Sequence, residues 1–233
     1  KWPGMHIWAY LVSRIGGAEA FAAAAASGDA RTGSFEDEAF VQAGYELKKL
    51  VDGGYFQEGF LGATHDQMQA AFGNGEAAME LGGQWSPSVE AANSADLVGV
   101  KNLGMFTFPA VEGGKGLATD IVGGGNGFAI GVNAEPEAID FVKYLTSVDN
   151  QKVIAASNTG IPVAKGAGEA LTDPNMVLVS EAVANSTYYQ LYFDQVLPSA
   201  MGGIINDAVQ KIFAGTATPE EVCAEIEAGF LAQ

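Results

Sequence analysis

The stretch Ala71-Phe-Gly-Asn-Gly-Glu-Ala-Ala-Met79, which runs into Gly82-Gly-Gln-Trp85, gives the clearest indication of the fold. Helical spacing up to the turn formers Gly73-Asn-Gly75 predicts the end of a helix. The apolar run at 77–81 then predicts a short buried strand. That strand would place Gln84 and Trp85 at its end, where a tryptophan ring can offer a flat apolar face to a sugar.

Capping signals elsewhere predict most of the helices. Ser34 precedes an expected helix from about 36 to 52, and Thr64-His-Asp-Gln67 opens the helix that ends at Gly73. Thr218-Pro-Glu-Glu221 opens the last helix in the same way. Prolines and capping residues indicate four more helices, beginning at Pro136, Asp149, Pro174 and near Pro198.

Two further strands are expected at 104–109 and 127–132, where apolar residues lie between turn formers. Because the strands are short and helices separate them, the fold class is α/β with more than one small sheet. The first residues, 1–6, read as an interior loop rather than as a signal sequence.

The composition excludes several classes of protein. With 48% hydrophobic and 17% charged residues, the chain can bury a core, and it is not a disordered tail. Its 28 acidic and 11 basic residues give a formal net charge of −17, which would repel nucleic acid. We therefore expect no nucleic-acid partner.

The sequence gives no pattern for a metal site or a cofactor site. His6 and His65 have no second histidine or cysteine at ligand spacing, and Cys223 lies in a helix pattern that favours simple packing. The glycines of Gly123-Gly-Gly-Asn-Gly127 precede a strand-like segment, whereas a nucleotide loop opens a helix. This loop is either a flexible crossing of the backbone or a close approach to a ligand. We expect neither a metal nor a cofactor.

The tryptophans fall into different classes. Trp85 is favoured as a binding residue, while Trp2 and the neighbouring His6 fit binding and packing about equally well. Trp8 lies inside an apolar stretch, which predicts a place in the core.

Four segments, in this order and spacing, resemble the extracellular solute-binding proteins of carbohydrate ABC importers, the family that includes the maltose-binding protein. They are residues 71–79 with 82–85, residues 104–109 with 123–130, residues 138–147 with Gln151 and 160–162, and residues 213–215 with 218–221.

The resemblance implies a two-lobed, type II periplasmic-binding-protein-like fold that is partial in this chain, because the family's N-terminal part is absent. Residues 1–115 would form the first part of the second lobe, and 170–233 its C-terminal helices. Residues 116–169 would form the inter-lobe crossing and a remnant of the first lobe.

The resemblance also implies a set of ligand-binding residues. Trp85, with Gln84 beside it, would lie on the wall of the sugar cleft. Asp120, Gly124 and Asn126 would lie at the crossing between lobes. A third part of the ligand-binding set would come from residues just before or at the start of the penultimate helix. With the candidates from the aromatic pattern, the remaining members of the set are Trp2, His6, Asp194, Gln195 and Met201.

The function that the resemblance implies is capture of a mono- or oligosaccharide by closure of two lobes, and delivery to the permease subunits of an ABC transporter. The protein would then work outside the cytoplasmic membrane, with a signal sequence not present in this chain. One alternative is a glycoside-processing enzyme, whose carboxylate pair could come from Glu76, Glu80, Asp120 or Asp194. Another is the same receptor fold with a non-sugar solute, such as a polyamine or a metal chelate.

Overall fold

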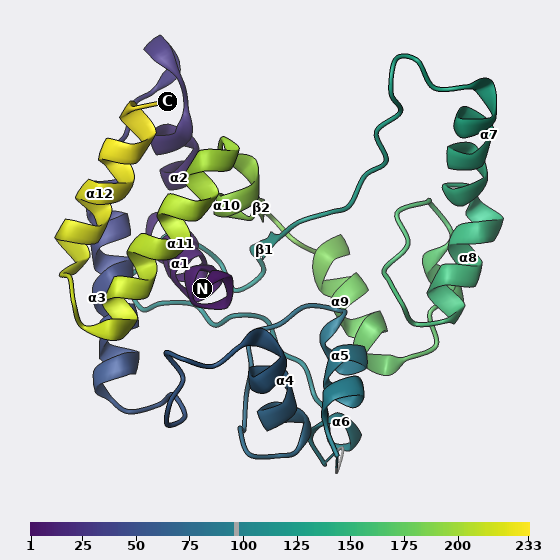
Figure 1. Cartoon of the computed structure of the whole chain (residues 1–233), viewed down its shortest axis with the longest axis horizontal. Helices are drawn as coiled ribbons and strands as arrows, with labels where there is room; N and C mark the ends of the chain where they lie inside the picture. Colours follow the sequence, from purple (N-terminus) through teal and green to yellow (C-terminus); the bar gives the residue numbers. More distant parts are fainter. Residues whose placement is uncertain (96–97) are drawn as a thin grey trace. The chain divides into compact units, whose positions relative to one another are not determined.

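The computed structural model describes residues 1–95 and 98–233 (Figure 1). They form two compact units, each described by itself. Unit 1 comprises residues 1–68, 107–124 and 186–233, and unit 2 comprises 69–106 and 125–185. Within the described residues, no helix is both long and apolar enough to cross a membrane. These units reflect packing inside the chain, and the assignment of residues to the two family lobes stays a prediction.

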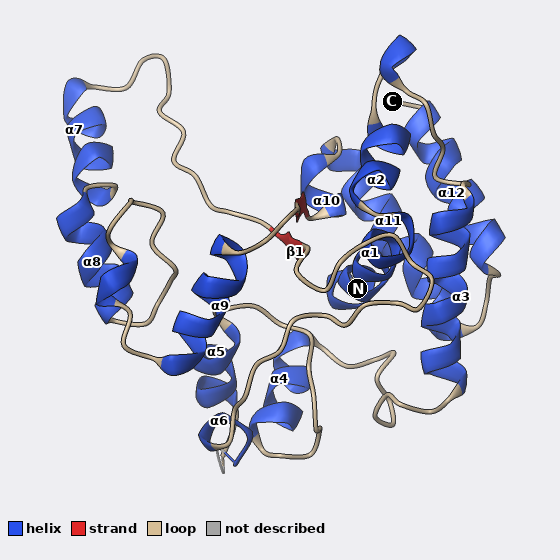
Figure 2. Ribbon diagram, turned by 180° about the vertical axis from the view of Figure 1, so that it is seen from behind, coloured by secondary structure: helices blue, strands red, loops and turns tan. Residues whose placement is uncertain are grey.

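Helices make up most of the ordered structure (Figure 2). The elements of unit 1 are α1 (Trp2–Gly16), α2 (Ala18–Ala25), η1 (Gly28–Ala30), α3 (Glu38–Asp52), β1 (Ile121–Gly123), β2 (Tyr189–Leu191), α10 (Phe193–Val196), α11 (Ser199–Ala214) and α12 (Pro219–Leu231). Helix α4 (His65–Gly73) spans the boundary between the units. Those of unit 2 are α5 (Ser86–Asn93), α6 (Val98–Lys101), α7 (Pro136–Leu145), α8 (Val148–Ala156), η2 (Gly168–Ala170) and α9 (Pro174–Ala184).

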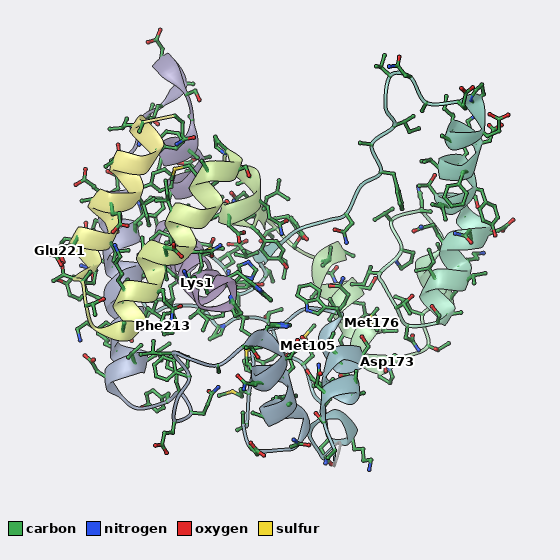
Figure 3. All side chains as sticks on the ribbon, in the orientation of Figure 1. Lys1, Met105, Asp173, Met176, Phe213 and Glu221 are labelled. Atoms are coloured by element: carbon green, nitrogen blue, oxygen red, sulfur yellow. The ribbon has the colours of Figure 1, made fainter. Side chains whose placement is uncertain are left out.

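The core of unit 1 forms around α1, which packs against α3 and α11, while α12 packs along α11 (Figure 1). Trp8 of α1 is fully buried, and its indole N–H donates to the carbonyl of Phe40. The predicted core position of Trp8 is therefore confirmed. Phe213, near the end of α11 (Figure 3), has its ring against Phe56. Cys223 is buried in α12, and burial raises the pKa of its thiol to about 12, so the thiol stays neutral at ordinary pH.

Strands β1 and β2 pair in parallel, with Ile121 opposite Tyr189 and Gly123 opposite Leu191. The α/β class is confirmed, but the predicted strand positions are wrong, and the described residues form one two-stranded sheet where more than one sheet was expected. Residues 77–81, 104–109 and 127–132 contain no strand, because no described residue forms a ladder with them. An apolar run supplies the side chains of a strand, but strand pairing also needs a neighbour, and among the described residues only 121–123 and 189–191 have one.

The N-terminal residues also differ from the prediction, because Trp2 begins α1 where a loop was expected. Pro3 lies in the first turn, which tolerates proline. Gly4 lets the helix approach α11 closely, since a side-chain carbon there would lie 2.5 Å from the ring of Phe213. The helix is held by burial of Met5 and Trp8, which a reading of residues 1–6 alone misses.

The predicted caps are largely confirmed. The main-chain N–H of Thr218 donates to the Glu221 carboxylate, and the N–H of Glu221 donates to the Thr218 hydroxyl. Thr64 and Gln67 exchange the same pair of bonds at the start of α4. Asp173 caps α9 by accepting from the N–H of Met176 (Figure 3). Helix α3 begins at Glu38, two residues later than expected, with Asp37 as its N-cap.

Candidate functional site

Four aromatic side chains of unit 1 form a continuous row, defined here as the aromatic row: His65, Trp2, His6 and Tyr192. The Trp2 ring lies 4.9 Å from that of His65 and 5.0 Å from that of His6, both tilted. His6 stacks on Tyr192 at 4.2 Å with an interplanar angle of 9°. Trp2 and His6 share one face of α1 because they are four residues apart.

Polar atoms at one end of the row lack partners. His6 Nε2 lies 3.9 Å from Asp194 Oδ1, which is an ion-pair distance rather than a hydrogen bond. Both atoms are buried without a hydrogen-bond partner, as is Oδ1 of Asn206. The amide of Asn206 donates to the other Asp194 oxygen at 3.1 Å. Burial by itself raises the pKa of Asp194, but His6 and Asn206 outweigh burial and lower the pKa overall, so Asp194 is ionised at neutral pH.

Tyr192 connects the aromatic row to the glycine-rich crossing. Its N–H donates to the carbonyl of Gly123, and a side-chain carbon at Gly124 would lie 2.7 Å from its ring. Burial, with Tyr189, Tyr10 and Asp194 nearby, raises the pKa of Tyr192 to about 12, so its phenol remains a neutral donor. Gly124 therefore permits close approach of its backbone to the Tyr192 ring, while the two roles expected for this loop, a flexible crossing and an approach to a ligand, stay predictions.

Three further residues from the predicted set lie in unit 1 but have different surroundings. Both carboxylate oxygens of Asp120 accept bonds from the chain itself, from the N–H of Leu117 and the hydroxyl of Thr187. Met201 is fully buried in the core. Gln195 is exposed on α10, and its side-chain oxygen would be 3.1 Å from a side-chain carbon at Gly124. Of these three, Gln195 is placed where a solute can reach it.

The other predicted residues lie in unit 2. Trp85 is half-buried at the N-cap of α5, and its ring folds over the backbone of Gly83, whose position has no room for a side chain. Gln84 is half-buried beside it, and Asn126 is exposed. The structure thus brings Trp2, His6, Asp194, Gln195 and Gly124 to one unit, and Trp85, Gln84 and Asn126 to the other.

The enzyme hypothesis requires a pair of carboxylates from among Glu76, Glu80, Asp120 and Asp194. Glu80 does meet another carboxyl group, but its partner is Glu90, which is fully buried and in hydrogen-bond contact with it. A glycosidase pair flanks the scissile bond at roughly 5–10 Å, and carboxyl groups in contact leave no room for a sugar. Among the described residues, no three His, Cys, Asp or Glu side chains gather to hold a metal ion.

The sequence interpretation missed several residues of this arrangement. On the sequence alone, His65 is treated only as a possible metal ligand. Tyr192, Asn206 and Glu90 are not named there as candidate site residues. The run 187–195, with three tyrosines and a phenylalanine among polar residues, contains a signal that could have indicated Tyr192. Asn206 and Glu90 lie within helices, where nothing in the local pattern separates them from surface polar residues.

Comparison with known proteins points to one family. Residues 2–152 match the family described as bacterial extracellular solute-binding protein. A multiple sugar-binding protein of Streptococcus mutans serotype c is 29% identical over 151 residues, which are 62% of this chain and 34% of that protein. The chain therefore spans about a third of the length of this curated relative.

Solved structures share the fold. One, from work on xylan utilisation by the thermophilic bacterium Caldanaerobius polysaccharolyticus, superposes with a TM-score of 0.82 at 27% identity, covering 97% of this chain and 58% of that one. A chitin oligosaccharide binding protein gives a TM-score of 0.78 at 23% identity, covering 99% and 57%. The expected solute-binding fold, partial in extent, is confirmed.

Proposed function

This chain belongs to the bacterial extracellular solute-binding protein family, and we propose that it is part of the substrate-binding component of an ABC transporter. The component captures a mono- or oligosaccharide outside the cytoplasmic membrane and delivers it to the permease subunits. Supporting this, the relatives include a multiple sugar-binding protein and a chitin oligosaccharide binding protein. The family and these two relatives are binding proteins rather than enzymes.

The observation that carries the proposal is the aromatic row with unpartnered polar atoms at its end. Carbohydrate recognition needs apolar ring faces for the C–H surfaces of a sugar and fixed polar groups for its hydroxyls. In this proposal the half-buried Trp2 supplies a ring face, and His6 Nε2 and Asp194 Oδ1 supply the polar groups.

In this proposal a sugar hydroxyl bridges His6 Nε2 and Asp194 Oδ1, which lie 3.9 Å apart. It can donate to the ionised carboxylate while it accepts from an imidazole N–H, so one hydroxyl satisfies both unpartnered atoms. Burial of such atoms without partners costs free energy, which binding would recover. Trp85 provides a second ring face on unit 2, and the same proposal assigns it to stacking.

The test is Asp194→Asn, which keeps the shape of the side chain and removes its charge. We expect affinity for xylo- or chito-oligosaccharides to fall about 10- to 100-fold, since a charge-assisted hydrogen bond contributes about 1.5–3 kcal/mol. Isothermal titration calorimetry measures the change. Asp207→Asn is the matched control, because Asp207 lies on α11 beside Asn206 but is exposed and pairs with Lys1. Equal affinity in both variants would contradict the assignment of Asp194.

A further inference from the structure

Two helices of the chain meet through polar rather than apolar side chains. The buried residues of α4 are Gln69 and Gly73, and those of α5 are Ser86 and Glu90. Each pair is four residues apart, so it lies on one face of its helix. Gln69 and Glu90 are both fully buried. With Glu80, the residues Gln69, Ser86 and Glu90 are called the polar seam below.

The seam has too few donors for its acceptors. The Gln69 amide donates to Glu80 and to Ser86 Oγ, both at 3.2 Å, which uses both of its hydrogens. Gln69 Oε1, Glu80 Oε2 and both oxygens of Glu90 are buried, and no donor group of the described residues reaches them. The hydroxyl hydrogen of Ser86 is the one donor left among these four side chains. A proton on one carboxyl group adds a donor and removes one of two buried negative charges.

The charges around Glu90 favour that proton. Glu80 is the titratable group that faces it, while α4 contributes Gln69 and α5 contributes Ser86. Lys101, the charged residue of α6, is exposed. In the described part of the chain, no ion pair involves either carboxyl group. Burial, reinforced by the hydrogen bond and the charge of Glu80, raises the pKa of Glu90 to about 8.

The seam is directly attached to the turn that presents Trp85. Glu80 precedes that turn and Ser86 follows it, and a side-chain carbon at Gly82 would lie 2.1 Å from Ser86 Oγ and 2.6 Å from Glu80 Oε1. On the next residue, the Trp85 ring covers Gly83 so closely that a side chain has no room. The position of the ring therefore depends on where Glu80 and Ser86 are held.

We propose that Glu90 is a positioning residue that holds Trp85 in place through a proton shared with Glu80, so that loss of this proton loosens the turn at 82–86 and weakens ligand binding. The effect on binding rests on the proposed function, whereas the effect on the turn does not. Two ionised carboxylates in contact repel each other, and separating them moves the residues on either side of Trp85.

Fluorine NMR of the chain labelled with fluorotryptophan tests the proposal without a ligand. The label reports on Trp2, Trp8 and Trp85, and the Trp85 signal is the one missing from Trp85→Phe. We expect this signal to shift with a midpoint near pH 8 in the unmodified chain. In Glu90→Gln it should stay constant at the low-pH position, because the amide donates to Glu80 at every pH.

Glu76→Gln is the matched control, since Glu76 is an exposed acid on the same segment and its removal should leave the midpoint unchanged. A Trp85 signal that is constant from about pH 5.5 to about 9.5 in the unmodified chain would overturn the proposal, and this reading needs no variant to fold. The same midpoint in Glu90→Gln would also overturn it.

Titration with xylo- and chito-oligosaccharides then separates the claim that a shared proton holds Trp85 from the claim that Trp85 binds sugar. If only the protonated form holds Trp85, affinity should fall about tenfold one pH unit above the midpoint, and Glu90→Gln should abolish this fall. A Trp85 signal that titrates, with sugar affinity unaffected by Trp85→Ala, would support the shared proton and contradict the stacking role of Trp85 instead.

Discussion

At the scale of single residues, burial and contacts distinguish the three tryptophans. Trp8 is fully buried and bonded to Phe40, whereas Trp85 is half-buried over a glycine and Trp2 meets two histidines. The apolar neighbours of Trp8 were enough to predict its core position. The contact between Trp2 and His65 could not be predicted, because His65 lies far along the chain and only the folded structure shows that the two rings meet.

For Trp85 we expect a loss of binding without a loss of stability. Trp85→Ala should weaken sugar affinity by about 2 kcal/mol, or about 30-fold, as for an aromatic binding hot spot. Its melting temperature should change little, because one face of the ring is not packed in the core. Trp8→Ala is the comparison, since removal of a buried tryptophan costs about 3–5 kcal/mol of stability. A steep fall in melting temperature for Trp85→Ala, with affinity unchanged, would make Trp85 a packing residue.

At the scale of elements, local signals located helices well and strands badly. Thr218 with Glu221 and Thr64 with Gln67 form the bonds that their spacing predicts, because capping partners lie within one turn. Strands depend on distant partners, so the three predicted strands do not form and residues 121–123 pair instead with 189–191. The close contact of Gly124 with Tyr192 also depends on the fold, because the two residues lie far apart in the sequence.

One ion pair links the segment after α2 to α12 and gives an element-scale prediction. Arg31 Nη2 lies 2.6 Å from Glu227 Oε2, which also accepts the N–H of Phe35. The hydrogen bond from Arg31 lowers the pKa of Glu227 below its ordinary 4.5, although burial opposes this. A lowered pKa means that the stabilisation is present above about pH 4.5 and is lost as the pH falls through the folded-state pKa.

Glu227→Gln should therefore lower the free energy of unfolding at neutral pH by about 1–3 kcal/mol, measured by urea denaturation. The difference from the unmodified chain should shrink as the pH falls below about 4.5 and disappear below the lowered folded-state pKa, where Glu227 is protonated and as uncharged as the glutamine. Glu225→Gln is the control, an exposed acid on the same helix that pairs with Lys211. A difference that does not change with pH would show that charge plays no part.

At the scale of the whole molecule, the packing of the two units differs. Unit 1 has a continuous core around α1, and Val12, Phe40 and Ile205 are fully buried there. In unit 2, α7 has the apolar spacing of a packed helix but none of its residues is buried, and Phe141 is 59% exposed. The pattern predicted the helix correctly, while the described chain supplies no partner that covers its apolar face.

The central proposal is that this chain recognises a carbohydrate. Calorimetric titration of the unmodified chain tests this proposal directly. Xylo- and chito-oligosaccharides would be compared with a polyamine, which the acidic net charge of −17 would attract non-specifically. We predict saturable binding of at least one oligosaccharide at physiological salt, and polyamine binding that disappears as salt is raised. Saturable, salt-resistant binding of the polyamine, with no heat from any sugar, would contradict the account.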